Sequence, residues 1–108
     1  MNPNDQITVD ELATLMNSDE AFVLLDVRTP GELDVAKIHP YVNIPLQNLE
    51  DNLDQLSKND KIRTLCHHGV RSLNAMAILR SHGYSDVKSV HGGIDAWSLT
   101  IDTSVKRY

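Results

Sequence analysis

Short apolar runs alternate along the chain with segments in which apolar residues recur at helical spacing. The runs have the length of strands buried on both faces of a sheet; they span residues 22–27, 61–65 and 87–90, with a brief strand or turn at 43–46. The helical segments are residues 9–16, 30–36, 46–56, 72–82 and 93–97. Strands that alternate with helices predict an α/β fold, in which helices cover both faces of a parallel sheet.

Capping sequences mark where two of these helices begin. Thr8 stands three residues before Glu11, and Thr29 stands three residues before Glu32, as the N-cap and N3 residues of a capping box do. Pro30 takes the first helical position after Thr29, where its fixed backbone angle suits a helix. Each of the two helices is therefore expected to begin directly after a threonine.

The chain has 108 residues, which is enough for one domain and too few for two of ordinary size. No repeat or linker divides it. We therefore expect residues 1–108 to form a single domain. Residues 101–108 show no clear pattern, and this tail is expected either to lie as a strap on the body or to be loose.

Charge and cysteine content narrow the functional classes. Ten basic and fifteen acidic residues give a net charge of −5, which disfavours general binding to nucleic acids and anionic membranes. The single cysteine, Cys66, cannot form an intramolecular disulfide, and residues 1–20 lack the basic and apolar regions of a signal peptide. No apolar stretch is long enough to cross a bilayer. These features predict a cytoplasmic protein without nucleic-acid or membrane partners.

Cys66 lies where a buried strand leads into a helix, and ligands bind at this end of the strands in parallel sheets. Free N–H groups at the start of a helix carry partial positive charge, and Gly69 allows the loop to turn its amides inward as an anion-binding nest. Arg71 adds a permanent cation that fits an oxyanion, and Ser72 can cap the helix or donate its hydroxyl. Together these groups favour a nucleophilic thiolate inside an anion-binding loop.

Four short blocks of sequence form an ordered set. The loop that begins at Cys66 reads Cys-x-x-Gly-x-Arg-Ser, and residues 26–32 read Asp-Val-Arg-x-x-x-Glu. Residues 43–45 read Asn-Ile-Pro, and residues 92–97 read Gly-Gly-x-x-x-Trp. This set resembles the motifs of the rhodanese-like sulfurtransferases, and the resemblance covers about residues 8–99.

The resemblance implies a rhodanese-like fold of three layers, in which helices flank a five-stranded, mainly parallel sheet. It also implies chemistry through a persulfide on Cys66, with Cys66 and Arg71 as the catalytic residues. Asp26 and Arg28 would support the neighbouring loops rather than act on the substrate. The residues expected to bind the substrate are His67, His68, Gly69, Val70, Arg71 and Ser72.

The expected reaction moves sulfane sulfur from a donor such as thiosulfate to an external thiol or cyanide. Because the chain has no second cysteine, the persulfide must be discharged by an acceptor from outside. No cofactor is expected. A metal site is not expected either, because the consecutive residues Cys66, His67 and His68 cannot easily reach one tetrahedral ion.

Three other functions fit part of the pattern. A sulfur carrier that delivers its persulfide to a protein partner would show the same residues and would differ in its docking surface. A regulatory module without catalysis would not need Cys66, Gly69 and Arg71 together. A phosphatase would carry a Cys-x5-Arg loop, whereas only four residues separate Cys66 from Arg71, and the loop holds no carboxylate to act as a general acid.

Overall fold

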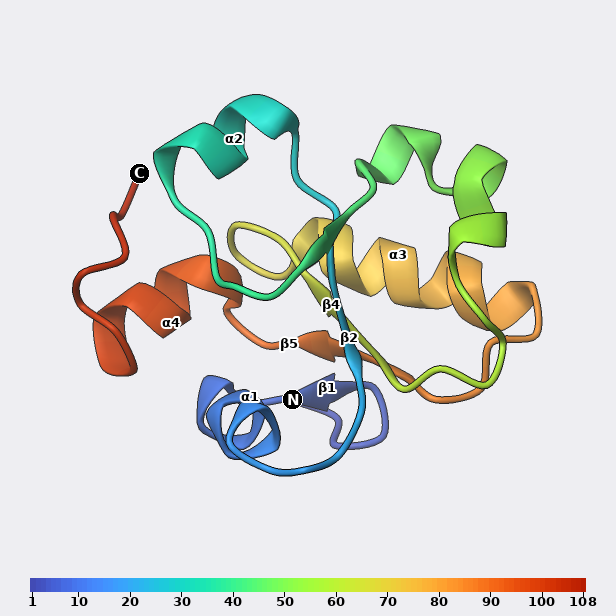
Figure 1. The fold of residues 1–108 in the computed structure, drawn as a ribbon, viewed down its shortest axis with the longest axis horizontal. Helices are drawn as coiled ribbons and strands as arrows, with labels where there is room; N and C mark the ends of the chain where they lie inside the picture. Colours follow the sequence, from blue (N-terminus) through green and yellow to red (C-terminus); the bar gives the residue numbers. More distant parts are fainter.

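The computed structural model describes residues 1–108, and a five-stranded sheet runs through its middle (Figure 1). The strands are β1 (Gln6–Ile7), β2 (Val23–Asp26), β3 (Val42–Asn43), β4 (Ile62–Leu65) and β5 (Val87–Val90). They lie in the order β1-β5-β4-β2-β3, and every neighbouring pair is parallel. The expected α/β class and parallel five-stranded sheet are therefore confirmed.

Helices cover both faces of this sheet. They are α1 (Val9–Met16), α2 (Pro30–Val35), α3 (Val70–Ser81) and α4 (Gly93–Thr100), together with the 3-10 helices η1 (Leu46–Asn48) and η2 (Glu50–Gln55). Successive side chains of a strand point to opposite faces of the sheet. On one face, Leu25 packs in an apolar cluster with Leu79 of α3. On the other face, Leu24 packs in a second cluster with Leu12 of α1 and Trp97 of α4. The core therefore consists of two layers of side chains with the sheet between them.

Both predicted capping boxes are present. The Thr8 hydroxyl accepts a hydrogen bond from the Glu11 amide at 3.1 Å, and the Glu11 carboxylate accepts one from the Thr8 amide at 3.1 Å. The same pair of bonds joins Thr29 and Glu32 at 3.3 Å, and Pro30 is the first residue of α2. These caps satisfy N–H groups that would otherwise have no partner at the helix starts.

Three predicted helices differ from those in the structure, and one of them, α4, runs to Thr100 instead of ending at residue 97. Residues 46–56 form two 3-10 helices instead of one α-helix, because Asn52 leaves the helical region at φ −128° and its side chain donates to the carbonyl oxygen of Asn48 at 2.7 Å. Helix α3 begins at Val70, two residues earlier than predicted, because Gly69 acts as its N-cap at φ 108°. Ser72 therefore lies inside the first turn, so that of the two roles considered for it, capping the helix is wrong and donation of its hydroxyl stays a prediction.

The two ends of the chain pack on the body. Strand β1 was not predicted from the sequence, because two residues show no periodicity; it is defined by pairing with β5, where Gln6 lies beside Ser89. After α4 the tail runs toward α2 (Figure 1). Arg107 of the tail donates to the Asp95 carboxylate at 2.9 Å. Of the two arrangements expected for the tail, the structure shows the strap.

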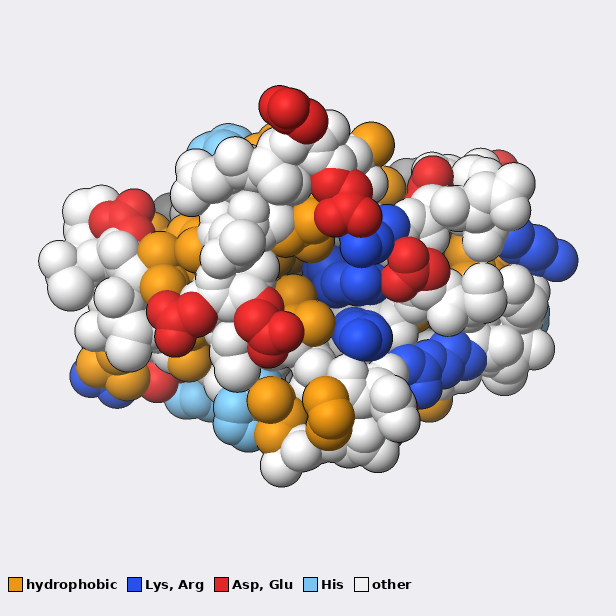
Figure 2. All heavy atoms as spheres, turned by 90° about the horizontal axis from the view of Figure 1, so that it is seen from below, with side chains coloured by type: hydrophobic (Ala, Val, Ile, Leu, Met, Phe, Trp, Pro, Cys, Tyr) orange, Lys and Arg blue, Asp and Glu red, His pale blue; other side chains and the backbone are white.

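Basic and acidic side chains lie side by side on the surface. Figure 2 shows a face on which Lys and Arg side chains gather near the middle, with acidic side chains next to them. Ion pairs of this kind join Lys61 to Glu20 at 2.8 Å and Arg80 to Asp5 at 2.7 Å. Among the helices, none combines the length and the apolar composition that a membrane span requires.

Candidate active site

The predicted loop lies at the carboxyl end of the central strands. Cys66 directly follows β4, and the amide of Val27, just after β2, donates to the carbonyl oxygen of Leu65 at 2.9 Å. Val27 and Cys66 belong to the same apolar cluster, so both side chains lie on the face of the sheet that α3 covers. The sulfur of Cys66 is thus held between the sheet and the start of α3, and only 1% of the residue is exposed.

Helix α4 holds the loop from its other side. The amides of Ile94 and Asp95 donate to the carbonyl oxygens of Cys66 and His67 at 2.9 and 3.1 Å. Gly93 lies so close that a Cβ atom at this position would collide with both carbonyl oxygens, and its φ of 61° also favours glycine. Gly93 of the Gly-Gly block therefore allows α4 to pack directly against the backbone of the cysteine loop.

Hydrogen-bond donors converge on the sulfur. The amides of Gly69 and Ser72 donate to Cys66 Sγ at 3.1 and 3.3 Å, and Ser72 Oγ lies 3.4 Å from the same atom. Ser72 Oγ is in turn 2.6 Å from Ser89 Oγ of β5, and both serines are fully buried. If Ser89 donates to Ser72, the Ser72 hydroxyl is free to donate to the sulfur. The two amides donate to the sulfur along directions in which an anion at this position would be stabilised.

Four further N–H groups of the loop have no acceptor within the chain. They belong to His67, His68, Val70 and Arg71. The amides of a loop and of the following first helical turn form an anion site when they are free in this way. The residues predicted to surround a substrate are therefore gathered in one loop, with Val70 and His68 exposed at its rim and Gly69 buried beneath them.

The side chain of Arg71 points to Glu32 of α2 rather than to the sulfur. Its two terminal nitrogens donate to the two carboxylate oxygens of Glu32 at 2.6 and 2.8 Å, and it makes no hydrogen bond with Cys66. The hydrogen bonds from Arg71 hold the pKa of Glu32 well below its usual range, and the pair raises the pKa of Arg71. The predicted cation is thus at the loop, but an acid partly neutralises it.

Tyr108 brings the tail into the same network. Its ring stacks on that of His67, with centroids 3.8 Å apart and planes 6° apart. Its hydroxyl donates to Glu32 at 2.7 Å and accepts from Arg28 at 3.0 Å. Burial, followed by the hydrogen bond to Glu32, raises the pKa of Tyr108 to about 12 against the opposing effect of Arg28. The tyrosine is thus a neutral donor to Glu32 at physiological pH.

The two loop histidines occupy different surroundings. Burial, and to a smaller extent the neighbouring His68, lowers the pKa of His67, and its Nε2 atom is buried without a hydrogen-bond partner. His68 is exposed, and its Nδ1 lies 3.9 Å from the carboxylate of Asp95. His67 is therefore a neutral ring packed under Tyr108, whereas His68 is accessible from solvent.

Asp26 and Arg28 form a buried ion pair behind the loop. Arg28 Nη2 lies 2.7 Å from an Asp26 oxygen, and it also donates to the carbonyl oxygen of Ala36 at 2.8 Å. Asn43 of β3 donates its side-chain amide to the carbonyl oxygens of both Asp26 and Arg28 at 2.9 Å. These bonds join the end of β2 to the end of α2 and to β3.

An open pocket of about 240 Å³ adjoins the loop. Its lining residues are Val27, Thr29, Pro45, Leu46, Gln47 and Arg71. Because Arg71 belongs to both the pocket lining and the loop, this pocket provides space for a small molecule at the edge of the loop.

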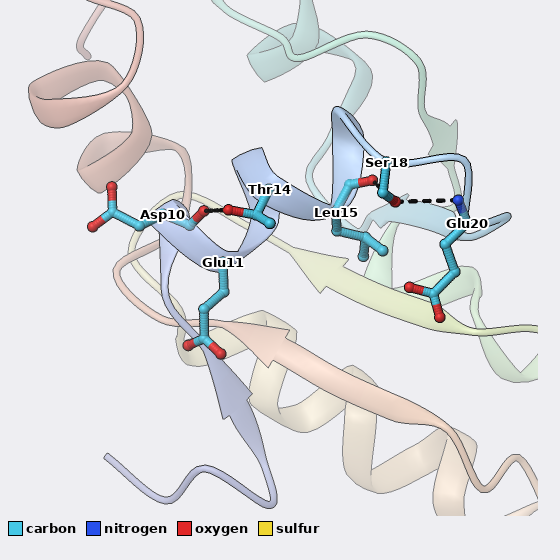
Figure 3. A pocket seen from close by; sticks show the side chains of 6 residues that line it. All are labelled: Asp10, Glu11, Thr14, Leu15, Ser18 and Glu20. Atoms are coloured by element: carbon cyan, nitrogen blue, oxygen red, sulfur yellow. Dashed lines mark hydrogen bonds between the residues drawn. The ribbon is translucent and has the colours of Figure 1, made fainter.

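The largest cavity, of about 410 Å³, lies along α1 and shares no residue with the loop. Figure 3 shows that its carboxylates, from Asp10, Glu11 and Glu20, lie apart and do not converge on one point. Glu11 is already engaged by its capping bond to Thr8. Nothing in this cavity resembles the converging donors of the Cys66 loop.

Three residues of the site were not singled out from the sequence. Glu32 stands in the Asp-Val-Arg-x-x-x-Glu block and in a capping box, but neither pattern identifies Arg71 as its partner. Ser89 and Tyr108 belong to no motif. Their roles depend on contacts between distant segments, and no local signal could have revealed them.

Comparison with known proteins identifies the fold and the family. A family model for the rhodanese-like domain matches residues 8–100. The crystal structure of a rhodanese-like domain protein from Staphylococcus aureus superposes with a TM-score of 0.83 and 31% sequence identity, and the match covers 96% of this chain and 98% of that one.

Two curated relatives are longer proteins. The chain is 34% identical to the adenylyltransferase and sulfurtransferase MOCS3-2 of Zea mays over 95% of its own length and 23% of the relative. It is 33% identical to the putative sulfur carrier protein YrkF of Bacillus subtilis over 86% of its own length and 50% of the relative. The chain thus spans between about a quarter and half of these relatives.

Proposed function

Because this chain belongs to the rhodanese-like domain family, we propose that it is a sulfurtransferase that carries sulfane sulfur as a persulfide on Cys66. The observation that carries the proposal is the convergence of the Gly69 and Ser72 amides on the cysteine sulfur, within a loop that has four more free N–H groups. This arrangement stabilises a thiolate before the reaction and an anionic persulfide after it.

In the first half of the reaction, the Cys66 thiolate attacks the outer sulfur of a donor such as thiosulfate. A new S–S bond forms, the S–S bond of the donor breaks, and sulfite leaves with the electron pair of that bond. The free amides of the loop bind the anionic donor and then the terminal sulfur of the persulfide. Arg71 contributes the part of its positive charge that its ion pair with Glu32 does not neutralise.

In the second half, an external thiolate or cyanide attacks the terminal sulfur of the persulfide. The bond between the two sulfurs breaks, the acceptor leaves with one sulfur atom, and the Cys66 thiolate is restored. The two half-reactions share one site and alternate, which predicts ping-pong kinetics. A reducing compartment such as the cytoplasm suits this cycle, because it keeps Cys66 free of unrelated oxidation.

Mass spectrometry of the intact protein tests this proposal. After incubation with thiosulfate, the protein should gain the mass of one sulfur atom, and cyanide should remove it. Cys66→Ser should gain nothing, and Ser81→Ala, which changes an exposed serine at the far end of α3, should behave like the unmodified protein. A protein whose Cys66 reacts with an alkylating reagent but takes no sulfur from thiosulfate would contradict the proposed donor.

A sulfur carrier is the second candidate, and the similarity to the putative sulfur carrier YrkF favours it. In that case the acceptor is a protein thiol rather than a small molecule. Transfer rates from the loaded persulfide to cyanide, to a small thiol and to a protein thiol separate the two candidates. Fast transfer to the protein thiol alone would assign the carrier function.

A further inference from the structure

Tyr108 and Arg71 are joined through a single carboxylate. Glu32 Oε2 accepts from Arg71 at 2.8 Å and from the Tyr108 hydroxyl at 2.7 Å, while Oε1 accepts from Arg71 alone at 2.6 Å. The Tyr108 hydroxyl also contacts Arg28, and a guanidinium can only donate. The hydroxyl proton must therefore point to Glu32, so this hydrogen bond has a defined direction.

We propose that Tyr108 is a positioning residue that sets the orientation and the effective charge of Arg71 through Glu32; this inference rests on the sulfurtransferase function proposed above. Its hydroxyl offsets part of the negative charge on Glu32. Arg71 consequently keeps more of its own positive charge for an anionic substrate at the Cys66 loop.

The tail is anchored in a way that keeps the hydroxyl in place. Arg107, the residue before Tyr108, pairs with Asp95 in the first turn of α4, and the amide of Asp95 binds the loop at the His67 carbonyl. On the other side, the tyrosine ring lies flat on the His67 ring. The tail is thus fixed to the same loop that its hydroxyl influences.

Removal of the hydroxyl should weaken the attraction of the site for anions. Without this donor, Glu32 Oε2 has Arg71 as its remaining side-chain donor and neutralises it more fully. Tyr108→Phe makes this change and keeps the ring that stacks on His67. The matched control is Tyr84→Phe, which removes a hydroxyl that donates to the Leu53 carbonyl oxygen at 2.9 Å, a group outside the loop.

The test compares how fast Cys66 reacts with iodoacetate, which is an anion, and with iodoacetamide, which is neutral. The ratio of the two rate constants reports the electrostatic potential at the sulfur and cancels changes in thiol reactivity. Tyr108→Phe should lower this ratio about fivefold, which is less than the tenfold or greater effect of losing a direct hydrogen bond to a charged group, because the hydroxyl acts on the site only through Glu32 and Arg71. Tyr84→Phe should leave it unchanged.

The same substitution in an Arg71→Ala background decides whether the effect passes through Arg71. There, Tyr108→Phe should change the ratio much less, because only the direct effect of the hydroxyl on the Glu32 charge remains. An unchanged ratio in the otherwise unmodified protein, or an equal drop with and without Arg71, would overturn the positioning role.

The readouts also separate this inference from the proposed function. If the ratio responds as expected but thiosulfate adds no sulfur, the positioning role stands and the proposed donor chemistry is wrong. If Cys66 of the unmodified protein reacts with neither reagent, the loop holds no reactive thiolate, and both proposals are wrong.

Discussion

At the scale of single residues, the chemistry of Cys66 depends on the groups that contact its sulfur and on the charged side chains beside the loop. Two backbone amides and the Ser72 hydroxyl provide the direct contacts, and the amides persist in any variant that does not introduce proline. Charge is supplied less directly, because Arg71 shares its positive charge with Glu32. The site therefore combines backbone amide donors with a positive charge, that of Arg71, whose effect depends on its ion pair with Glu32.

Glu32→Gln should make the stability of the protein less dependent on pH. At neutral pH this change should lower the free energy of unfolding by about 1 kcal/mol, because the Arg71 pair is partly exposed. Arg71 holds the pKa of Glu32 below its ordinary value of 4.5, so the pair stabilises the protein fully above that pH and progressively less as the pH falls below it.

Urea unfolding across the acidic range checks this prediction. The difference between Glu32→Gln and the unmodified protein should be largest at neutral pH and should shrink between about pH 5 and about pH 3. A difference that stays constant over this range would show that Glu32 contributes through packing rather than through its charge.

The sequence revealed the residues of the site only where they are close together in the chain. Cys66, Gly69 and Ser72 lie within one loop and its following turn, so their spacing alone predicts that they meet. The partner of Arg71 lies 39 residues earlier in the chain, and Tyr108 lies in a tail without periodic pattern. Such contacts form only when distant segments pack together in the folded chain, so no local sequence pattern predicts them.

At the scale of elements, the junction between β4 and α3 depends on α4. The two carbonyl oxygens that α4 binds belong to Cys66 and His67, so the helix fixes the backbone that carries the nucleophile. Gly93 allows this close approach. Strands β2, β4 and β5 and most helices followed from hydrophobic periodicity, whereas β1 did not, because two residues show no period. The 3-10 helices of residues 46–55 did not follow from it either, because the side chain of Asn52 competes with the backbone.

Gly93→Ala should disrupt the site more than it disrupts the rest of the fold. The new Cβ would collide with the backbone oxygens of Cys66 and His67, and the residue would keep an unfavourable positive φ. We expect a loss of about 3 kcal/mol in the free energy of unfolding and loss of persulfide formation with thiosulfate.

Gly31→Ala is the matched control for this prediction. A Cβ at Gly31 has no atom within 4 Å, and its φ is not positive, so stability and persulfide formation should be unchanged. Equal behaviour of the two alanine variants would show that α4 does not fix the loop.

At the scale of the whole molecule, one buried arginine connects segments that are far apart in the sequence. Arg28 pairs with Asp26, binds the carbonyl oxygen after α2, and reaches the hydroxyl of Tyr108. The alternation of strands and helices predicted the layered architecture. It did not predict that an ion pair lies fully buried inside it, because charged residues in a strand sequence are ordinarily assigned to the surface.

Arg28→Leu should be strongly destabilising, because Asp26 would remain buried without its partner. We expect the free energy of unfolding to fall by about 3–5 kcal/mol, measured by urea unfolding. Lys61→Met, which removes one side of a partly exposed ion pair with Glu20, should change it by less than about 1 kcal/mol. Similar losses in the two variants would contradict the structural role of the buried pair.

The contact between α4 and the cysteine loop also has a consequence for the order in which the protein becomes functional during synthesis. The ribosome adds Cys66 about thirty residues before Ile94 and Asp95, whose amides complete the loop. Until those residues have emerged and docked, the cysteine belongs to an unfinished backbone and behaves as an ordinary thiol. Maturation of the nucleophile therefore has to wait for the docking of α4.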